Sequence, residues 1–349
     1  MRPTSKDLKD CLDFGDMLQI PAEEISDGEL IVSSPKLSVI LMTRNHEAFV
    51  AQSINSILKQ QCAFAFEVLI GEDFSTDNTR SVCEDLQKKY PNKIRLIVAD
   101  RNVGITPNFL RLVARARGEY IALLEGDDYW TDLNKLSIQV KLMEENPEFA
   151  WCGARTINRT LCMPPVEFYT LEETLRRYIV HTSTIVFRRE YLSSYPRFPD
   201  VVGWISMVYA YLATKGLCGF INKELSYYRH HQGGVWTGAT ISERVRLTRI
   251  FTDTMNDYFS GNYQLELADR ELWIHGLHLE ALLSDWGFTH WKDLLRTLPV
   301  LVHRCGRLQP WITFRTVWLI IVASITFTIR WGRRKLAIRT RVKALFGHS

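Results

Sequence analysis

Three carboxylates are crowded into the segment "EGDDYW", at Glu125, Asp127 and Asp128. They directly follow the apolar run 120–124, which has the composition of a buried strand. Carboxylates this close together repel one another, and each is costly to remove from water. A divalent cation among them would relieve both costs, and oxygen ligands suit Mg²⁺ or Mn²⁺. The usual partner of such an ion is a substrate diphosphate, whose charge the ion stabilises as it leaves.

The elements that must position these acids form a repeating pattern. Apolar runs at residues 37–42, 66–70, 94–98 and 120–124 are typical of strands covered on both faces. Between them, apolar residues recur at helical spacing. Alternating strands and helices predict the α/β class, with a doubly wound, mostly parallel sheet flanked by helices. In such sheets the ligand lies beyond the carboxyl ends of the strands.

A polar segment follows each predicted strand, at residues 43–47, 71–79, 99–108 and 125–130. Helix capping explains any one of these turns, but four on one edge, one with three acids, favour a nucleotide site. The chain has no GxxxxGK[ST] loop and no GxGxxG after its first strand, which argues against P-loop and dinucleotide chemistry. A nucleotidyltransferase would need a basic glycine-rich loop there, which "TRNHEAF" does not supply. The pattern favours nucleotide-sugar chemistry.

An ordered set of motifs resembles a known family. These motifs are "LSVILMTRN", "FEVLIGEDFSTDNT", "RNVGITPNF", "GEYIALLEGDDYW" and "KLSIQVKLMEENPEF". They resemble the N-terminal half of the inverting GT-A-fold glycosyltransferases of family two, and "GFINKELSYYRHHQGGVW" (219–236) resembles a later segment of a bacterial subgroup. The resemblance spans residues 36–236. It implies transfer of a sugar from a nucleotide sugar, most often a UDP-sugar, to a hydroxyl of a glycan or lipid-linked acceptor.

The resemblance also implies roles for individual residues. Asp127 would be the firm ligand of Mn²⁺ or Mg²⁺, with Glu125 as its weaker partner, and His231 would approach the metal or the diphosphate. A loop histidine without a ligand is the alternative for His231. Trp130 and Trp236 would contact the sugar or acceptor, with core packing as the alternative for Trp236. The nucleotide site would comprise Thr43, Arg44, Asn45, Glu72, Asp73, Asn102, Gly104 and Glu125, and Asp73 would hydrogen-bond the base.

Two departures from the family pattern concern catalysis. The metal motif reads Glu-Gly-Asp where the family usually has Asp-x-Asp. Inverting transfer also needs a general base for the acceptor hydroxyl, and Gly203 is followed directly by Trp204, with Ile205 where the family has its Asp. Asp200 and Asp128 are the candidate bases. If neither serves, the chain would be a catalytically impaired protein that binds nucleotide or glycan.

The remaining regions predict the domain organisation and location. We expect an extension over 1–35 that drapes on the domain or stays loose, a GT-A domain over 36–236, a helical region over 237–305 and a basic tail over 306–349. Within the tail, the uncharged part of the apolar run, 316–329, is short for a membrane crossing. Basic residues flank it on both sides, so we expect residues 311–343 to lie on the membrane surface. A crossing helix and a buried core helix are the alternatives.

The cysteine pattern and the N-terminal sequence predict the cellular compartment. The seven cysteines are scattered without CxxC spacing, and the N-terminus lacks the apolar run of a signal peptide. These features predict a cytoplasmic protein, peripheral on the inner face of the cytoplasmic membrane. The net charge of +4 does not indicate a nucleic-acid partner.

Overall fold

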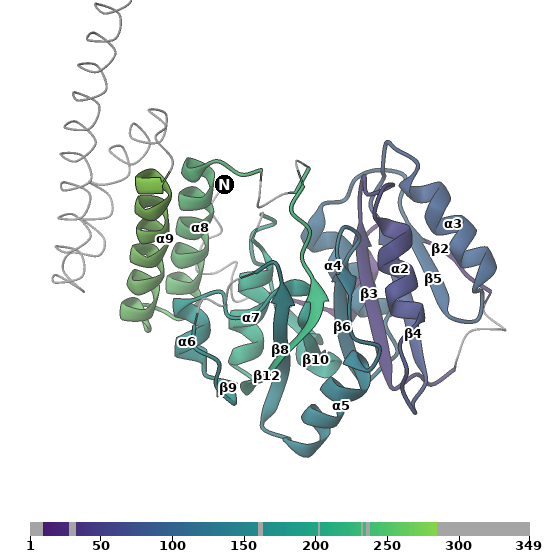
Figure 1. The fold of residues 1–349 in the computed structure, drawn as a ribbon, viewed down its shortest axis with the longest axis horizontal. Helices are drawn as coiled ribbons and strands as arrows, with labels where there is room; N and C mark the ends of the chain where they lie inside the picture. The colour runs from purple at the N-terminus through teal and green to yellow at the C-terminus, as the bar shows by residue number, and fades with distance from the viewer. Residues whose placement is uncertain are drawn as a thin grey trace, which may run out of the picture. The chain divides into compact units, whose positions relative to one another are not determined.

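The computed structural model describes residues 10–27, 33–159, 163–201, 203–231, 233–234 and 238–284. The chain divides into two compact units. The first unit is Met1–Gly238 with Asp253–Asn262, and the second is Ala239–Thr252 with Tyr263–Ser349. The first unit carries the sheet (Figure 1).

Four parallel strands form one half of this sheet. They run in the order β5 (Ile94–Val98), β4 (Phe66–Glu72), β3 (Leu37–Thr43) and β6 (Tyr120–Glu125). Every residue of β3, β4 and β5 is buried, because helices cover both faces. The four strands predicted from apolar runs are therefore confirmed, with β4 extending two residues further and β3 and β6 one residue further than expected.

The other half of the sheet is mixed in direction. Strand β10 (Val186–Arg188) pairs antiparallel with β6 and with β8 (Phe149–Ile157). Strand β12 (Leu217–Tyr227) runs parallel to β8, while β7 (Tyr129–Trp130) and β9 (Phe168–Tyr169) pair with β12 antiparallel. This half brings the chain after β12 back beside the acids that follow β6.

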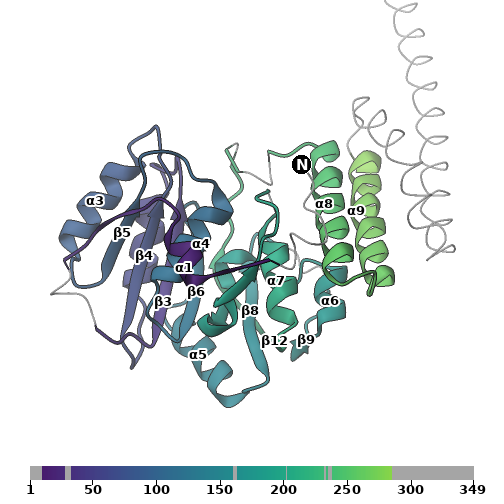
Figure 2. The same ribbon diagram turned by 180° about the vertical axis from the view of Figure 1, so that it is seen from behind.

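Helices cover the two faces of the sheet, as the doubly wound prediction requires. On one face, α2 (Val50–Leu58), α3 (Thr79–Lys89) and α5 (Lys135–Glu145) pack on alternate residues of the strands and share one apolar core. On the other face lie α1 (Phe14–Leu18), α4 (Ile105–Arg115) and α7 (Ile205–Ala213), which Figure 2 shows from behind. A short helix, α6 (Leu171–Arg176), lies against α7.

The N-terminal segment contributes strands to this unit. Strand β1 (Cys11–Asp13) pairs with β11 (Ser194–Pro196), and β2 (Glu23–Ile25) adds antiparallel to the outer edge of β5. Glu24 of β2 bonds Arg95 of β5 at 2.7 Å. The described residues 10–27 thus pair with strands of the first unit.

Helices make up the described part of the second unit. These helices are α8 (Ile241–Tyr258) and α9 (Gln264–Ser284). The part of α8 from Asp253 onward belongs to the first unit. Both helices fall within the region 237–305, where the sequence predicts helices. Within the described residues, no helix is long and apolar enough to cross a membrane. The segment 311–343, predicted to lie on the membrane surface, is outside the described residues.

Candidate active site

The loops that follow β3 and β4 are tied to each other at the carboxyl edge of the sheet. The backbone N–H of Asp73 donates to the carbonyl of Thr43 at 3.1 Å. Asn45 accepts the N–H of Thr76 at 2.8 Å, and its own N–H donates to the Ser75 hydroxyl at 3.0 Å. Asn45 has a φ of 54°, which asparagine tolerates better than most residues. Three residues of the predicted nucleotide site thus meet here.

Asp73 joins a third loop to this edge. Its carboxylate accepts the backbone N–H groups of Val103 at 2.8 Å and Gly104 at 3.2 Å. Asn102 also accepts from Gly104, at 2.9 Å. Burial raises the pKa of Asp73, although these N–H donors oppose that shift. The structure therefore brings Asn102 and Gly104 together with Asp73.

Two other predicted nucleotide-site residues take different positions. Glu72 is fully buried, and its Oε1 accepts the N–H of Ser75 at 2.6 Å, so it supports the loop from beneath. Arg44 is exposed, and its charge opposes the rise that burial causes in the pKa of Asp73. Of the two, Arg44 is the one that a ligand can reach.

Asp200 lies against the turn that contains Gly104. Its Oδ1 accepts the N–H of Thr106 in the first turn of α4 at 3.0 Å, as a helix-capping carboxylate does. Gly104 has a φ of 98°, and a Cβ there would overlap Oδ2 of Asp200. Ile205, at the position of the expected Asp, is the first residue of α7 and is buried. Asp200 is therefore the exposed acid that precedes α7.

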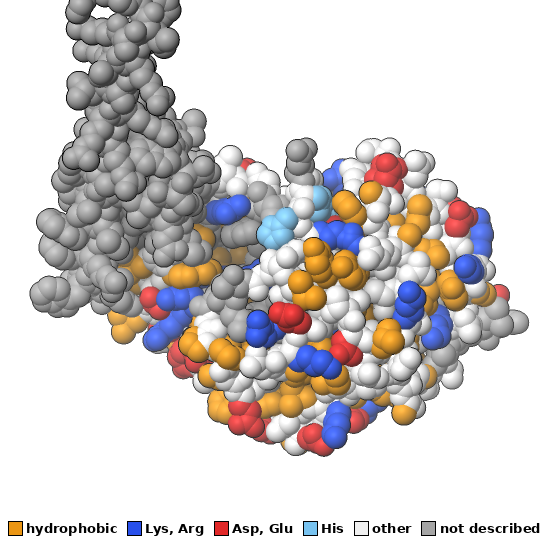
Figure 3. Space-filling view, viewed as in Figure 1, with side chains coloured by type: hydrophobic (Ala, Val, Ile, Leu, Met, Phe, Trp, Pro, Cys, Tyr) orange, Lys and Arg blue, Asp and Glu red, His pale blue; other side chains and the backbone are white. Residues whose placement is uncertain are grey.

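Asp127 faces two histidines. Its Oδ2 lies 3.1 Å from Nε2 of His231 and 3.8 Å from Nε2 of His46. His46 is held by the hydroxyl of Thr43 at 3.2 Å from its Nδ1, and burial lowers the pKa of His46. Histidine side chains reach the surface at the upper edge of the face in Figure 3. The structure thus places the two predicted metal ligands, Asp127 and His231, side by side.

Asp128 points away from solvent. It is 1% exposed, and its Oδ1 accepts the backbone N–H of Arg229 at 3.0 Å. Its Oδ2 lies 3.5 Å from Nδ1 of His181 and has no hydrogen-bond partner among the described residues. Burial, reinforced by the charge of Asp127, raises the pKa of both Asp128 and Glu125. Each of these two carboxyl groups therefore favours its neutral, protonated form unless a cation lies nearby.

Glu125, Asp128 and His181 could hold a divalent cation, because their ligand atoms lie within 4.8 Å of one another. Asp127, next to His231 and His46, adds a further carboxylate to this edge of the sheet. Carboxylates suit Mg²⁺ and Mn²⁺. The raised pKa values of Glu125 and Asp128 indicate that a cation would be favourable here.

Comparison with protein families agrees with this geometry. Residues 38–195 match the model of Glycosyl transferase family 2. The chain carries a family 2 glycosyltransferase domain.

Two bacterial proteins illustrate the similarity in sequence. The chain is 30% identical over 225 residues to the uncharacterized protein Rv1520 of Mycobacterium tuberculosis, covering 60% of this chain and 62% of that one. It is 28% identical over 208 residues to the UDP-Glc:alpha-D-GlcNAc-diphosphoundecaprenol beta-1,3-glucosyltransferase WfgD of Escherichia coli, covering 57% and 79%. The match thus spans less than two thirds of the mycobacterial relative's length.

Solved structures share the fold of the glycosyltransferase domain. Residues 1–349 of TarS from Staphylococcus aureus, in complex with UDP-GlcNAc, give a TM-score of 0.59 at 16% identity, covering 85% of this chain and 92% of that one. The mannosyltransferase PcManGT from Pyrobaculum calidifontis, in complex with GDP-Man and Mn²⁺, gives 0.53 at 17% identity, covering 90% and 92%. Both likenesses show the GT-A fold.

The two predicted tryptophans have different outcomes. Trp130 is 4% exposed, and its Nε1 donates to the carbonyl of Ser183 at 2.8 Å. The structure therefore places Trp130 beneath the site, where it supports the chain that carries His181. Trp236 lies outside the described residues.

Sequence reasoning missed two histidines of the site in the glycosyltransferase domain. His46 lies in "TRNHE", the polar segment that follows β3. Its position at the carboxyl end of a parallel strand could have marked it as a site residue. His181 lies far along the chain in a segment without a motif, and it reaches Asp128 only through the fold. Arg229, whose backbone holds Asp128, was seen only as part of the pattern that contains His231.

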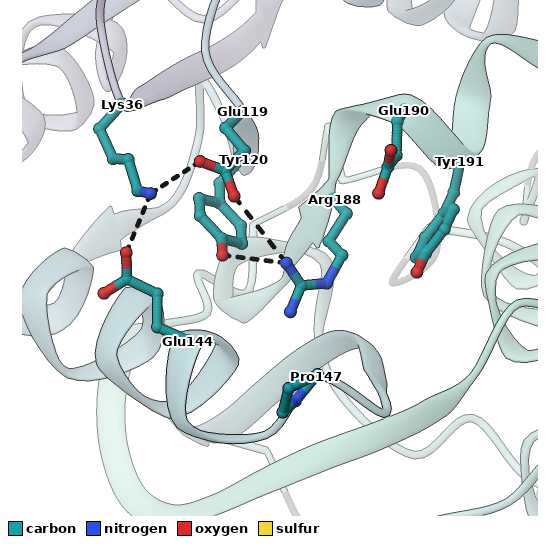
Figure 4. A pocket seen from close by; sticks show the side chains of 8 residues that line it. All are labelled: Lys36, Glu119, Tyr120, Glu144, Pro147, Arg188, Glu190 and Tyr191. Carbon is teal, nitrogen blue, oxygen red and sulfur yellow. Dashed lines mark hydrogen bonds and ion pairs between the residues drawn. The ribbon is translucent and has the colours of Figure 1, made fainter.

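A separate pocket of about 490 Å³ lies at the opposite edge of the sheet (Figure 4). Its lining includes Lys36 and Tyr120, at the amino ends of β3 and β6. Lys36 bonds Glu119 at 2.7 Å and Glu144 at 2.9 Å, and Arg188 bonds the hydroxyl of Tyr120 at 3.0 Å. Because it lies at the amino ends of the strands, the pocket is not part of the candidate active site.

Proposed function

We propose that this chain is a metal-dependent inverting glycosyltransferase of the hexosyl or N-acetylhexosaminyl type. It would move a sugar from a nucleotide sugar, of the UDP type, to a hydroxyl of a glycan or lipid-linked acceptor. The observation that carries the proposal is the meeting of Asp127 with His231 and His46 at the sheet edge where Asp73 gathers the loops. The UDP-GlcNAc bound to TarS and the acceptor named for WfgD support the donor and acceptor classes.

In this mechanism the nucleotide lies over the loops that Asp73 joins. Each carboxylate oxygen of Asp73 accepts one backbone N–H, and it retains capacity for the N–H of a base. Asp127 and His231, with Glu125 beside them, would hold Mn²⁺ or Mg²⁺. Such an ion neutralises the diphosphate and stabilises the leaving group.

The general base is proposed to be Asp200, with Asp128 as the second candidate. A base must approach the acceptor hydroxyl to within hydrogen-bond distance. Asp200 is exposed, and it adjoins Gly104 on the nucleotide side of the site. Asp128 is 1% exposed, which keeps an acceptor away from its oxygens. Exposure therefore favours Asp200.

One observation favours a second candidate function, a binding protein without turnover. The buried side chain of Ile205 stands where the family has its base, and the carboxylate of Asp200 is already engaged as a helix cap. Such a protein would bind nucleotide or glycan through the same residues but would not transfer the sugar.

Calorimetric titration of the native chain with UDP, with and without Mn²⁺, tests the nucleotide step. We expect binding that strengthens when Mn²⁺ is added. Folded protein that binds UDP no better than millimolar would overturn the proposal. A donor screen by thermal shift follows, because a ligand that binds the native state raises the melting temperature. Binding without transfer across donors and acceptors would favour the second candidate.

We also propose that the chain works at the inner face of the cytoplasmic membrane. The basic residues within 311–343 would bind anionic lipid there, and the diphosphoundecaprenol acceptor named for WfgD supports a membrane location. We expect the full chain to float with vesicles that contain an anionic lipid, and to be released at high salt. Equal flotation with zwitterionic vesicles would count against this electrostatic role.

A further inference from the structure

We propose that Asp128 and Arg229 form a clamp that holds His231 against Asp127, so that both act as positioning residues for the cation site. The inference rests on the proposed metal-dependent function. It gives Asp128 a role other than that of a base, and it gives Arg229 a role that its sequence motif does not specify.

The first half of the clamp joins the acids to the chain that carries His231. Oδ1 of Asp128 accepts the backbone N–H of Arg229 at 3.0 Å, two residues before His231. Asp128 is itself fixed, because its N–H donates to the carbonyl of Glu125 at 3.1 Å and its carbonyl accepts from the hydroxyl of Ser53 on α2. A rigid acid at the end of β6 thus sets the position of the chain after β12.

The second half of the clamp is the side chain of Arg229. Its guanidinium lies over two aromatic rings, 5.0 Å from the centroid of Phe49 and 4.8 Å from that of Tyr129. Its Nη2 also donates to Oε1 of Gln52 on α2. A guanidinium over the face of an aromatic ring is attracted by the negative potential of that face. The side chain is therefore held by Phe49, which precedes α2, by Gln52 of α2 and by Tyr129 of β7.

The two rings that contact Arg229 also pack against His231 and against Tyr227 of β12. Phe49 packs against the imidazole of His231 at 4.9 Å between ring centroids. Tyr129 stacks on Tyr227 at 5.0 Å, and these two residues are direct partners across β7 and β12. The guanidinium of Arg229 and the imidazole of His231 thus share Phe49. Loss of the guanidinium would free the Phe49 ring that packs against His231, whereas loss of the Asp128 carboxylate would free the backbone that precedes His231.

A clamp of this kind should control cation affinity. Residues that orient a metal ligand, without binding the metal, typically change metal affinity by about 10–100-fold when they are removed. Neither Arg229 nor its contacts need to touch the nucleotide or the sugar. The effect should therefore appear in the binding of Mn²⁺ alone, before any transfer is measured.

Titration of the full chain with Mn²⁺, followed by the electron paramagnetic resonance signal of free Mn²⁺, tests the clamp. We expect Arg229→Met and Asp128→Ala to weaken Mn²⁺ binding by roughly 10–100-fold. Asp128→Asn should restore most of the affinity, because its amide oxygen can still accept the N–H of Arg229. Arg155→Met serves as the control, since Arg155 forms a surface ion pair with Glu224 at 3.4 Å.

The outcomes separate the clamp from the proposed function. No Mn²⁺ binding by the native chain, with or without UDP, would overturn the metal-dependent function and the clamp with it. Native binding with unchanged affinity in Arg229→Met would overturn the clamp alone. Asp128→Asn as weak as Asp128→Ala would show that Asp128 binds the ion itself. If Arg229→Met does not fold, Gln52→Met removes only the hydrogen bond to α2 and should weaken binding about 2–10-fold.

Discussion

Nε2 of His231 lies 3.1 Å from Oδ2 of Asp127, although 104 residues separate the two in the chain. Asp127 lies just after β6, in the parallel half of the sheet. His231 lies just after β12, in the mixed half. The pairing therefore joins the two halves of the sheet at the edge where parallel α/β sheets bind ligands. It gives the crowded acids an imidazole neighbour that could bind a metal ion.

Replacing Asp127 with Asn tests the metal role. We expect kcat/KM with a UDP-sugar to fall by at least roughly 100-fold, because the carboxylate would contact the ion directly. The melting temperature should stay the same or rise, since Asp127 raises the pKa of Glu125 and Asp128 by repulsion. Steady-state kinetics and thermal melts measure the two effects. Asp85→Asn, at an exposed position of α3, should match the native chain, and a large loss of stability in Asp127→Asn would contradict this interpretation.

Replacing Asp200 with Asn tests the proposed base. The amide oxygen can still accept the N–H of Thr106, so the cap of α4 should survive and the free energy of unfolding should change by less than about 1 kcal/mol. Transfer should nevertheless slow by about 10²–10⁴-fold, while UDP binding is retained. Asp100→Asn is the matched control, because the side chain of Asp100 is 79% exposed in the loop that precedes α4. Native kcat in Asp200→Asn would leave Asp200 only the role of a helix cap.

A buried charge network under the sheet should be a main contributor to stability. Glu67 is fully buried, and its carboxylate bonds Arg117 at 2.7 Å, Arg95 at 3.1 Å and the Ser38 hydroxyl at 2.7 Å. Glu67→Ala leaves two guanidinium groups without this partner, so we expect a loss of about 3–5 kcal/mol in urea unfolding. Glu84→Ala, in a surface pair on α3, should cost less than about 1 kcal/mol. Similar losses in both variants would refute this difference.

Lys135 should make stability depend on pH. Its ammonium is buried, lies 4.1 Å from the ring centroid of Trp130, and has no hydrogen-bond partner among the described residues. Burial lowers the pKa of Lys135 from 10.5 to about 7. Between these two values the unfolded chain binds more protons than the native one, so stability rises with pH by up to about 1.4 kcal/mol per unit. Below pH 7 both states are protonated, and the penalty is constant.

The variant Lys135→Met should remove this pH dependence. We expect it to be more stable than the native chain at pH 7 by about 1–3 kcal/mol, because an unpaired buried amine is replaced by an apolar chain. Urea unfolding at pH 7, 8 and 9 measures both effects. Lys141→Met, on the same helix but 72% exposed, should keep the native slope. Parallel pH profiles for Lys135→Met and the native chain would rule out the proposed titration.

The parallel half of the sheet could be predicted from sequence because its signals are local. The runs that became β3, β4, β5 and β6 are continuous and apolar, and each is followed by a polar turn. Parallel strands carry their ligand groups at one edge, so this pattern also placed Asp73 and Asp127 at a common rim. The identity of the acids then pointed to a metal and a diphosphate.

Only the tertiary structure decided which distant residues join that rim. Strand β12 runs parallel to β8 and ends beside β7, which brings His231 to Asp127. The fold likewise puts His181 next to Asp128, and Asp200 against Gly104. These neighbours depend on pairing between strands far apart in the chain, and hydrophobic periodicity carries no record of such pairing. Burial, which turns Trp130 into a support and Asp128 into a clamp, also exists only once the sheet and helices have packed.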